Sequence, residues 1–185
     1  MAGKSFKNIT RAVLEVIGEL GRVAQIGFSQ KTLTQKMMLM ELGYDPFQIN
    51  KTVKRLTKQE YIDKKLKEKT EKYVLTKKGM EQINFLRLEN LPFDEKSKKW
   101  DGNWRVVIFD IPETIRGLRD AFREKLHEWP FYKLQNSVFV CPYECREEIK
   151  QACKILKLEK YVLVLKSREL SYVETKLRKH FGIIS

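Results

Sequence analysis

The spacing of apolar residues changes about halfway along the chain. In the first half, apolar residues recur three and four positions apart, which is the period of one helix face. This period predicts helices over residues 8–23, 32–42 and 77–89, and a further short helix that begins at Pro46. The first half is therefore predicted to be mainly helical.

A lysine-rich hairpin is predicted between the helix that begins at Pro46 and the helix over 77–89. Tyr61 and Ile62 open its first strand, Thr70-Glu71 form its tip, and residues 72–76 make its second strand. Thr76 is then expected to cap the following helix, because its hydroxyl can accept from the first backbone N–H groups.

The second half alternates short apolar runs with amphipathic stretches. Strands are predicted over 104–109, 131–134, 137–141 and 161–165, helices over 116–128 and 144–156, and a last amphipathic segment over 169–181. The order βαββαβ is that of the ferredoxin-like split unit. The predicted fold class is α+β, with an N-terminal helical domain over 1–90, a linker over 91–102, and a ferredoxin-like dimerisation domain with a C-terminal helix over 103–185.

The helix that begins at Pro46 has one apolar and one basic face. Asp45 is suited to the N-cap and Pro46 to the first helical position, while Ile49, Val53 and Leu56 form the apolar stripe. The remaining polar side chains are of types that reach base edges and phosphates. They are Gln48, Asn50, Lys51, Lys54, Arg55 and Lys58.

The hairpin adds further cations, namely Lys64, Lys65, Lys67, Lys69 and Lys72. A helix, a turn, a basic helix and a basic hairpin in this order predict a winged helix-turn-helix that binds double-stranded DNA. Lysine-rich helices are also common as solvated surfaces. It is the order of the parts that favours DNA binding.

The net charge of +13, from 37 Lys+Arg and 24 Asp+Glu, agrees with a polyanionic partner. Such a charge also suits RNA or an acidic membrane surface. No apolar run approaches the length of a membrane span, and the first residues do not resemble a signal peptide. Together with three cysteines in no familiar zinc-binding spacing, these features predict a cytoplasmic protein with reduced thiols and no cofactor.

The second half resembles the central domain of the PaaX-like regulators, the phenylacetate-degradation repressor family. The residues that carry the resemblance are Trp100, Gly102, Trp104, the run Phe109-Asp110-Ile111-Pro112-Glu113, Arg116, Arg119, and the run Leu134-Gln135-Asn136-Ser137-Val138. With the winged helix ahead of it, the resemblance covers about residues 5–170. It implies a homodimeric transcriptional repressor, which acts by occupying its operator and is not an enzyme.

The same segment is similar to the ferredoxin-like CRISPR-associated adaptation subunit. In that family an aspartate at the end of the first strand binds a divalent metal, and the matching residue is Asp110. This similarity implies an alternative function, a metal-dependent nuclease or nucleic-acid scaffold that uses Mg²⁺. A third alternative is an architectural DNA-binding protein with little sequence preference.

PaaX-like repressors usually carry a further carboxy-terminal domain, whereas this sequence ends at Ser185. The resemblance therefore does not define a small-molecule effector such as an acyl-CoA.

Overall fold

The computed structural model describes residues 6–24, 32–67, 70–94 and 99–183. Contacts divide the chain into two compact units, unit 1 (Met1–Leu86) and unit 2 (Arg87–Ser185). Both helices and strands are present, so the predicted α+β class is confirmed at this level. No helix in the described ranges has the length and apolar character needed to cross a bilayer.

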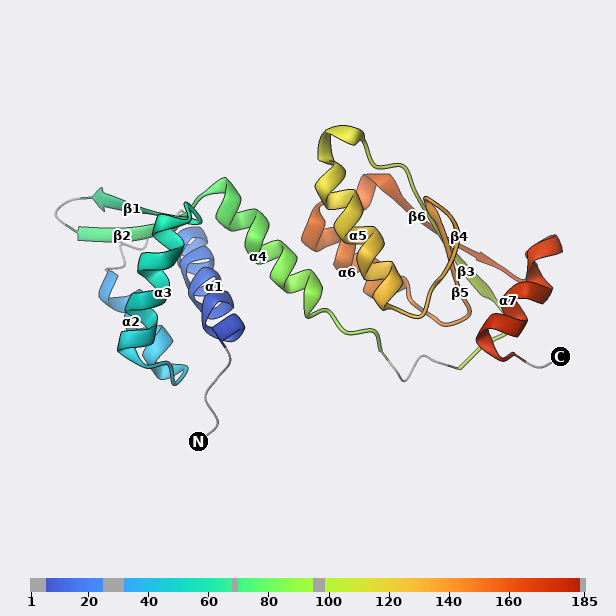
Figure 1. Ribbon diagram of the computed structural model, residues 1–185, viewed down its shortest axis with the longest axis horizontal. Coiled ribbons are helices and arrows are strands. Elements are labelled where there is room, and N and C mark those ends of the chain that lie inside the picture. Colours follow the sequence, from blue (N-terminus) through green and yellow to red (C-terminus); the bar gives the residue numbers. More distant parts are fainter. Residues whose placement is uncertain (1–5, 25–31, 68–69, 95–98, 184–185) are drawn as a thin grey trace. The chain divides into compact units, whose positions relative to one another are not determined.

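Unit 1 combines helices with a two-stranded ribbon (Figure 1). Its elements are α1 (Phe6–Ala24), α2 (Thr32–Glu41), α3 (Pro46–Lys58), β1 (Ile62–Lys67), β2 (Thr70–Leu75) and α4 (Lys77–Glu89), whose last residues belong to unit 2. Apolar side chains from α1, α2, α3, β1 and α4 meet in one core. They include Ile9, Val13, Leu14, Val16, Ile17, Leu39, Ile49, Val53, Leu56, Ile62 and Ile83.

The two predicted helix caps of unit 1 are confirmed. The carboxylate of Asp45 accepts a hydrogen bond from the backbone N–H of Gln48 at 3.0 Å, directly ahead of α3. The hydroxyl of Thr76 accepts from the backbone N–H of Gly79 at 3.0 Å, at the start of α4. Each cap satisfies a backbone donor that has no partner within its helix.

The predicted tip of the hairpin is wrong. Thr70 and Glu71 belong to β2, where they pair with Lys67 and Leu66 in an antiparallel register that begins at Ile62 opposite Leu75. Residues 68–69, between the two strands, lie outside the described residues. β-branched Thr70 suits a pleated strand, so the ladder extends farther than the turn-like sequence indicates.

Unit 2 contains a four-stranded antiparallel sheet of order β4-β5-β3-β6. Its elements are β3 (Trp104–Phe109), α5 (Arg116–Glu128), β4 (Tyr132–Gln135), β5 (Val138–Cys141), α6 (Arg146–Leu156), β6 (Val162–Ser167) and α7 (Glu174–Phe181). The predicted sequence of strands and helices is confirmed, and the bounds of β3 and α5 agree with the prediction to the residue.

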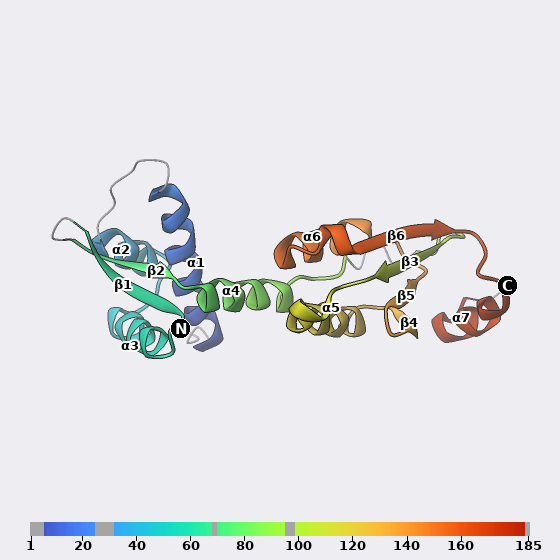
Figure 2. The same cartoon turned by 90° about the horizontal axis from the view of Figure 1, so that it is seen from above.

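The two faces of this sheet are covered differently. On one face, the ring of Phe109 contacts Phe122 of α5 at 5.5 Å and Phe139 of β5 at 6.0 Å between centroids. Figures 1 and 2 show α7 on the opposite side of the sheet from α5 and α6. There Trp104, Val106 and Val140 pack with Leu177 of α7.

The predicted C-terminal helix over 169–181 is shorter in the structure. Ser171 has a φ of 51°, which is incompatible with a continuous α-helix, and a 3₁₀ turn over Ser171–Val173 precedes α7. The carboxylate of Glu174 accepts from the backbone N–H of Leu170 at 3.1 Å and so closes this turn.

Candidate nucleic-acid interface

The outward face of α3 presents four residues spaced four, three and four positions apart, which places them in one line along the helix. They are Phe47, Lys51, Lys54 and Lys58, and all four are exposed. The opposite face is fixed in the core by Ile49, Thr52, Val53 and Leu56. Because the core fixes the rotation of the helix, these four residues, here called the α3 stripe, must face away from unit 1.

The three lysines of the α3 stripe have their charges open to solvent. Within the described ranges, no carboxylate pairs with Lys51, Lys54 or Lys58. Gln48 and Asn50 are also exposed and lie on the two flanks of the stripe. The face therefore offers hydrogen-bond donors and positive charge to a partner.

Arg55 is placed differently from the other predicted DNA-binding residues of α3. Its side chain is half-buried, with Nη2 donating to the hydroxyl of Thr10 at 2.8 Å and Nη1 donating to Oε1 of Gln59 at 2.7 Å. The guanidinium group thus links α3 to α1. Sequence reasoning could not detect this link, because Thr10 lies 45 positions away.

The hairpin supplies the remaining predicted cations. Lys64 and Lys65 are exposed on β1, and as successive strand residues they point to opposite faces of the ribbon. Lys67 and Lys72 belong to β1 and β2, but their side chains lie outside the described part of the chain. Lys69 lies outside the described residues altogether.

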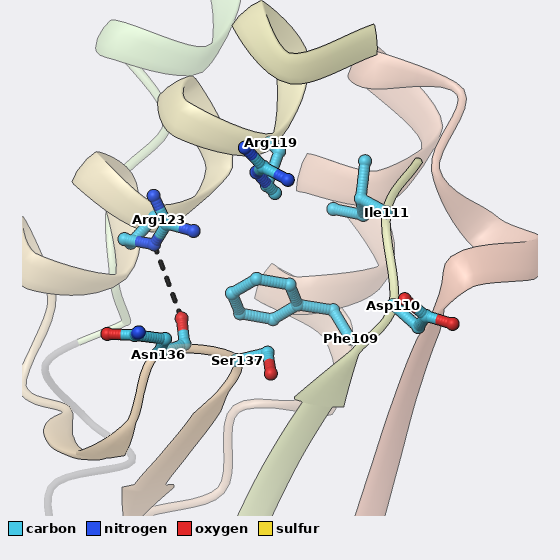
Figure 3. A pocket seen from close by; sticks show the side chains of 7 residues that line it. All are labelled: Phe109, Asp110, Ile111, Arg119, Arg123, Asn136 and Ser137. Carbon is cyan, nitrogen blue, oxygen red and sulfur yellow. Dashed lines mark hydrogen bonds between the residues drawn. The ribbon is translucent and has the colours of Figure 1, made fainter. Parts of the chain in front are cut away.

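Unit 2 contains an open pocket of about 410 Å³ at the end of β3. It is lined by Phe109, Asp110, Ile111, Arg119, Arg123, Asn136 and Ser137. Figure 3 shows Arg119 and Arg123 beside the ring of Phe109, while the side chain of Asp110 points away from both arginines.

Both arginines of this pocket have carboxylate partners. Arg119 Nη1 donates to Glu113 at 2.8 Å, and Arg123 Nη1 donates to Asp120 at 2.9 Å. Arg123 Nε also donates to the backbone carbonyl of Asn136 at 3.3 Å. These bonds hold α5 against the start of β5, and they neutralise charge that an anionic ligand would otherwise meet.

A second ion cluster in unit 2 is centred on Arg105 of β3, whose side chain is almost fully buried. Arg105 donates to both oxygens of Asp101, at 2.5 and 2.9 Å, and to Glu144 at 2.6 Å. The hydrogen bonds from Arg105 hold the pKa of Asp101 well below its usual range. Burial opposes ionisation of Glu144, yet its hydrogen bonds with Arg105 and with the backbone of Arg146 leave its pKa lowered.

Residues 97–179 match the family model described as the PaaX protein central Cas2-like domain. This match covers every strand of the sheet in unit 2. Unit 2 is thus similar to the PaaX central Cas2-like domain. The resemblance predicted from the sequence is confirmed over these residues, and the PaaX family is one of regulators rather than enzymes. No curated protein matches the chain.

Within the matched residues, Asp110 is an exposed residue directly after β3, and its backbone N–H donates to the carbonyl of Tyr161 at 3.0 Å. No group of three or more His, Cys, Asp or Glu side chains in the described part of the chain is arranged to hold a metal ion. One carboxylate is a small ligand set for Mg²⁺. Asp110 on its own supplies one ligand of such a site.

Proposed function

We propose that the protein is a DNA-binding transcriptional regulator that represses transcription by occupying its operator. In this proposal unit 1 is a winged helix-turn-helix, in which α3 enters the major groove and the β1–β2 hairpin is the wing. The observation that carries the proposal is the α3 stripe, where three exposed lysines have no carboxylate partner in the described ranges. Lysines presented in this way neutralise phosphates or donate to base edges.

The wing has a separate role in this proposal. Lys64 and Lys65, with Lys67, Lys69 and Lys72 farther along the hairpin, would contact phosphates and so add affinity without sequence preference. Arg55 would support readout by holding α3 against α1 rather than by reaching a base. Gln48 and Asn50 remain candidates for base-edge contacts from the flanks of the stripe.

Unit 2 would pair two copies of the chain as a ferredoxin-like dimerisation domain. The strand order β4-β5-β3-β6 with antiparallel neighbours is that of a split βαβ sheet. Leu163 and Leu165 of β6 are 53% and 44% exposed on the face that α7 covers only in part. Because contiguous exposed apolar surface often marks an interaction site, this half of the face is the proposed homodimer interface.

A dimer of this kind binds a symmetric operator, with half-site centres about 10 or 20 base pairs apart. Such a regulator needs no cofactor and would work in the cytoplasm. Selection of binding sites from a random duplex pool tests the proposal, and an enriched inverted repeat is expected. Uniform binding of all sequences would instead favour an architectural protein.

The dimer interface is tested with the double variant Leu163→Glu/Leu165→Glu, which we expect to be monomeric by light scattering. Tyr172→Glu is the matched control, because Tyr172 is exposed in the same unit but lies outside the strands. A wild-type protein that stays monomeric with operator DNA bound would contradict the proposed assembly.

The alternative is the metal-dependent nuclease that uses Asp110, favoured by the Cas2-like match and by the exposure of this carboxylate at the end of β3. Incubation of labelled DNA and RNA with Mg²⁺ or Mn²⁺ decides between the two functions. Cleavage by the wild-type protein that is lost in Asp110→Asn would establish the nuclease, whereas the regulator leaves every substrate intact.

A further inference from the structure

Phe47 is an aromatic residue whose ring is not part of the core of unit 1. Its side chain is 74% exposed, although burial of a phenylalanine ring away from water is strongly favourable. It follows Pro46 in the first turn of α3, where the Asp45 carboxylate bonds to the N–H of Gln48. Phe47 is thus held in place by a capped helix terminus rather than by a loop.

The surroundings of Phe47 restrict what can cover it. The residue begins the α3 stripe, and the rest of that stripe is Lys51, Lys54 and Lys58. A partner that buries the ring must also accept three positive charges along the same line, for which the described part of the chain supplies no carboxylate. The partner is therefore a polyanion that presents an apolar group within about one helix turn, 5–6 Å, of the nearest lysine.

Duplex DNA meets this requirement through a single chemical group. In the major groove, the 5-methyl group of thymine is the apolar feature among base-edge donors and acceptors, and a phenylalanine side chain can contact it. The N-terminal residues of a recognition helix are those that contact base edges. Phe47 stands at that end of α3.

We propose that Phe47 is a specificity residue that recognises thymine by contact with its 5-methyl group. This inference rests on the proposed DNA-binding function and names one base class for its site. Lys51 lies one turn after Phe47 and is suited to the acceptor pair O6 and N7 of guanine. The expected half-site therefore contains a thymine within about two base pairs of a guanine, since successive base pairs are roughly 3.4 Å apart.

The experiment exchanges thymine for deoxyuridine, which lacks only the 5-methyl group. Each thymine of a selected duplex is replaced in turn, and the dissociation constants of the wild-type protein and of Phe47→Ala are measured. We expect one thymine in each half-site to weaken wild-type binding about fourfold when replaced, which is the size expected for the burial of one methyl group. The same replacement should leave binding by Phe47→Ala unchanged.

Two matched variants show whether the effect belongs to Phe47. Lys54→Ala removes a cation from the same stripe, and it should weaken binding to thymine and deoxyuridine duplexes by the same factor. Leu42→Ala removes another exposed apolar side chain of unit 1. It should leave the dissociation constants for both the thymine and the deoxyuridine duplex unchanged. Phe47→Leu keeps an apolar side chain at the position and should retain part of the methyl effect.

The outcomes separate this inference from the proposed function. A protein that binds no duplex DNA would overturn both. Specific binding in which no thymine is sensitive to deoxyuridine, or in which Phe47→Ala keeps the sensitivity, would overturn the inference alone. Binding to phosphatidylserine vesicles that depends on Phe47, with DNA binding unaffected, would assign the residue to a lipid surface instead.

Discussion

Both units are rich in basic side chains, but these side chains have different surroundings in the two units. On α3 of unit 1, Lys51, Lys54 and Lys58 face solvent without a carboxylate partner in the described ranges. In unit 2, Arg105 bonds to Asp101 and Glu144, Lys125 to Glu128, and Arg178 to Glu174. Paired charges largely cancel at a distance, so net charge does not locate a polyanion site. What distinguishes the α3 stripe is that three exposed lysines without a carboxylate partner in the described ranges lie in one line along a helix.

The largest effect should come from removing the lysines of the α3 stripe. We expect Lys51→Ala/Lys54→Ala/Lys58→Ala to weaken operator binding by about 3–6 kcal/mol, because each lysine neutralises a phosphate or donates to a base. The slope of log K against log salt should become shallower by roughly 0.9 for each phosphate that the variant no longer neutralises. Titration of labelled operator at several salt concentrations measures both changes.

The control for that variant changes the same amount of charge in unit 2, through Lys150→Ala/Lys154→Ala/Lys160→Ala. All three control lysines are exposed, and only a small loss is expected. Equal losses in the two triple variants would mean that net charge, rather than the α3 stripe, governs DNA binding.

Glycine-to-alanine changes compare the packing of the units. A Cβ atom at Gly79 would lie within van der Waals overlap of the backbone carbonyl of Tyr61, which itself accepts from Thr76. We expect Gly79→Ala to lower the stability of unit 1 by about 3 kcal/mol, as overpacking against backbone does. Faster amide hydrogen exchange in peptides of α1 and α3 should report this loss of stability.

Gly117→Ala is the matched change in α5 of unit 2, where a Cβ atom meets nothing within 4 Å. Alanine is the better helix former, so a stabilisation of up to about 1 kcal/mol is expected. All three tryptophans of the chain, Trp100, Trp104 and Trp129, lie in unit 2, and their fluorescence follows the unfolding of this unit. Destabilisation by Gly117→Ala, or tolerance of Gly79→Ala, would contradict the packing described here.

The sequence predicted local features well and distant contacts poorly. Helices with a clear apolar period, and the caps at Asp45 and Thr76, depend on residues within one turn. The hairpin tip depends on the pairing of two strands, and the start of α7 on the positive φ of Ser171, so neither could be deduced from local spacing.

For the candidate site residues too, contacts between residues far apart in the sequence were not predictable. Thr10, one partner of Arg55, is 45 residues away, and Glu144, one partner of Arg105, is 39 residues away. Phe47 was missed for another reason, since a search for polar side chains omits an aromatic residue. Its spacing of four from Lys51 and its place opposite the Ile49–Val53 stripe were signals that the sequence contained.

The Arg105 cluster should make unit 2 sensitive to acid. The pKa of Asp101 is lowered in the folded protein, so the stabilisation is complete above its usual value near 3.8 and is lost as pH falls below that value. At neutral pH we expect Arg105→Met to lower the free energy of unfolding by about 2 kcal/mol, moderated because Asp101 and Glu144 remain partly hydrated. At pH 3 the difference from wild type should shrink.

Urea unfolding followed by tryptophan fluorescence at pH 7 and pH 3 measures both values. Arg116→Met is the control, because Arg116 is exposed and its pairs with Glu113 and Asp120 should contribute little. A deficit in Arg105→Met that is as large at pH 3 as at pH 7 would mean that lost packing, not the ion cluster, causes it.

The smallest expected effect distinguishes two roles for Arg55. If the residue acts by linking α3 to α1, Thr10→Val should reproduce most of the effect of Arg55→Ala, because either change removes the 2.8 Å hydrogen bond. Each variant should then lower the stability of unit 1 by about 1 kcal/mol and weaken all duplex sequences by a similar factor. The double variant should add little to either single change, since the two side chains share one interaction.

The other possible role of Arg55 is direct readout of a base. Binding to the selected operator and to its single-base variants tests this role. Loss of discrimination at one base position in Arg55→Ala, with Thr10→Val unaffected, would show that the guanidinium group leaves Thr10 and reads a base directly.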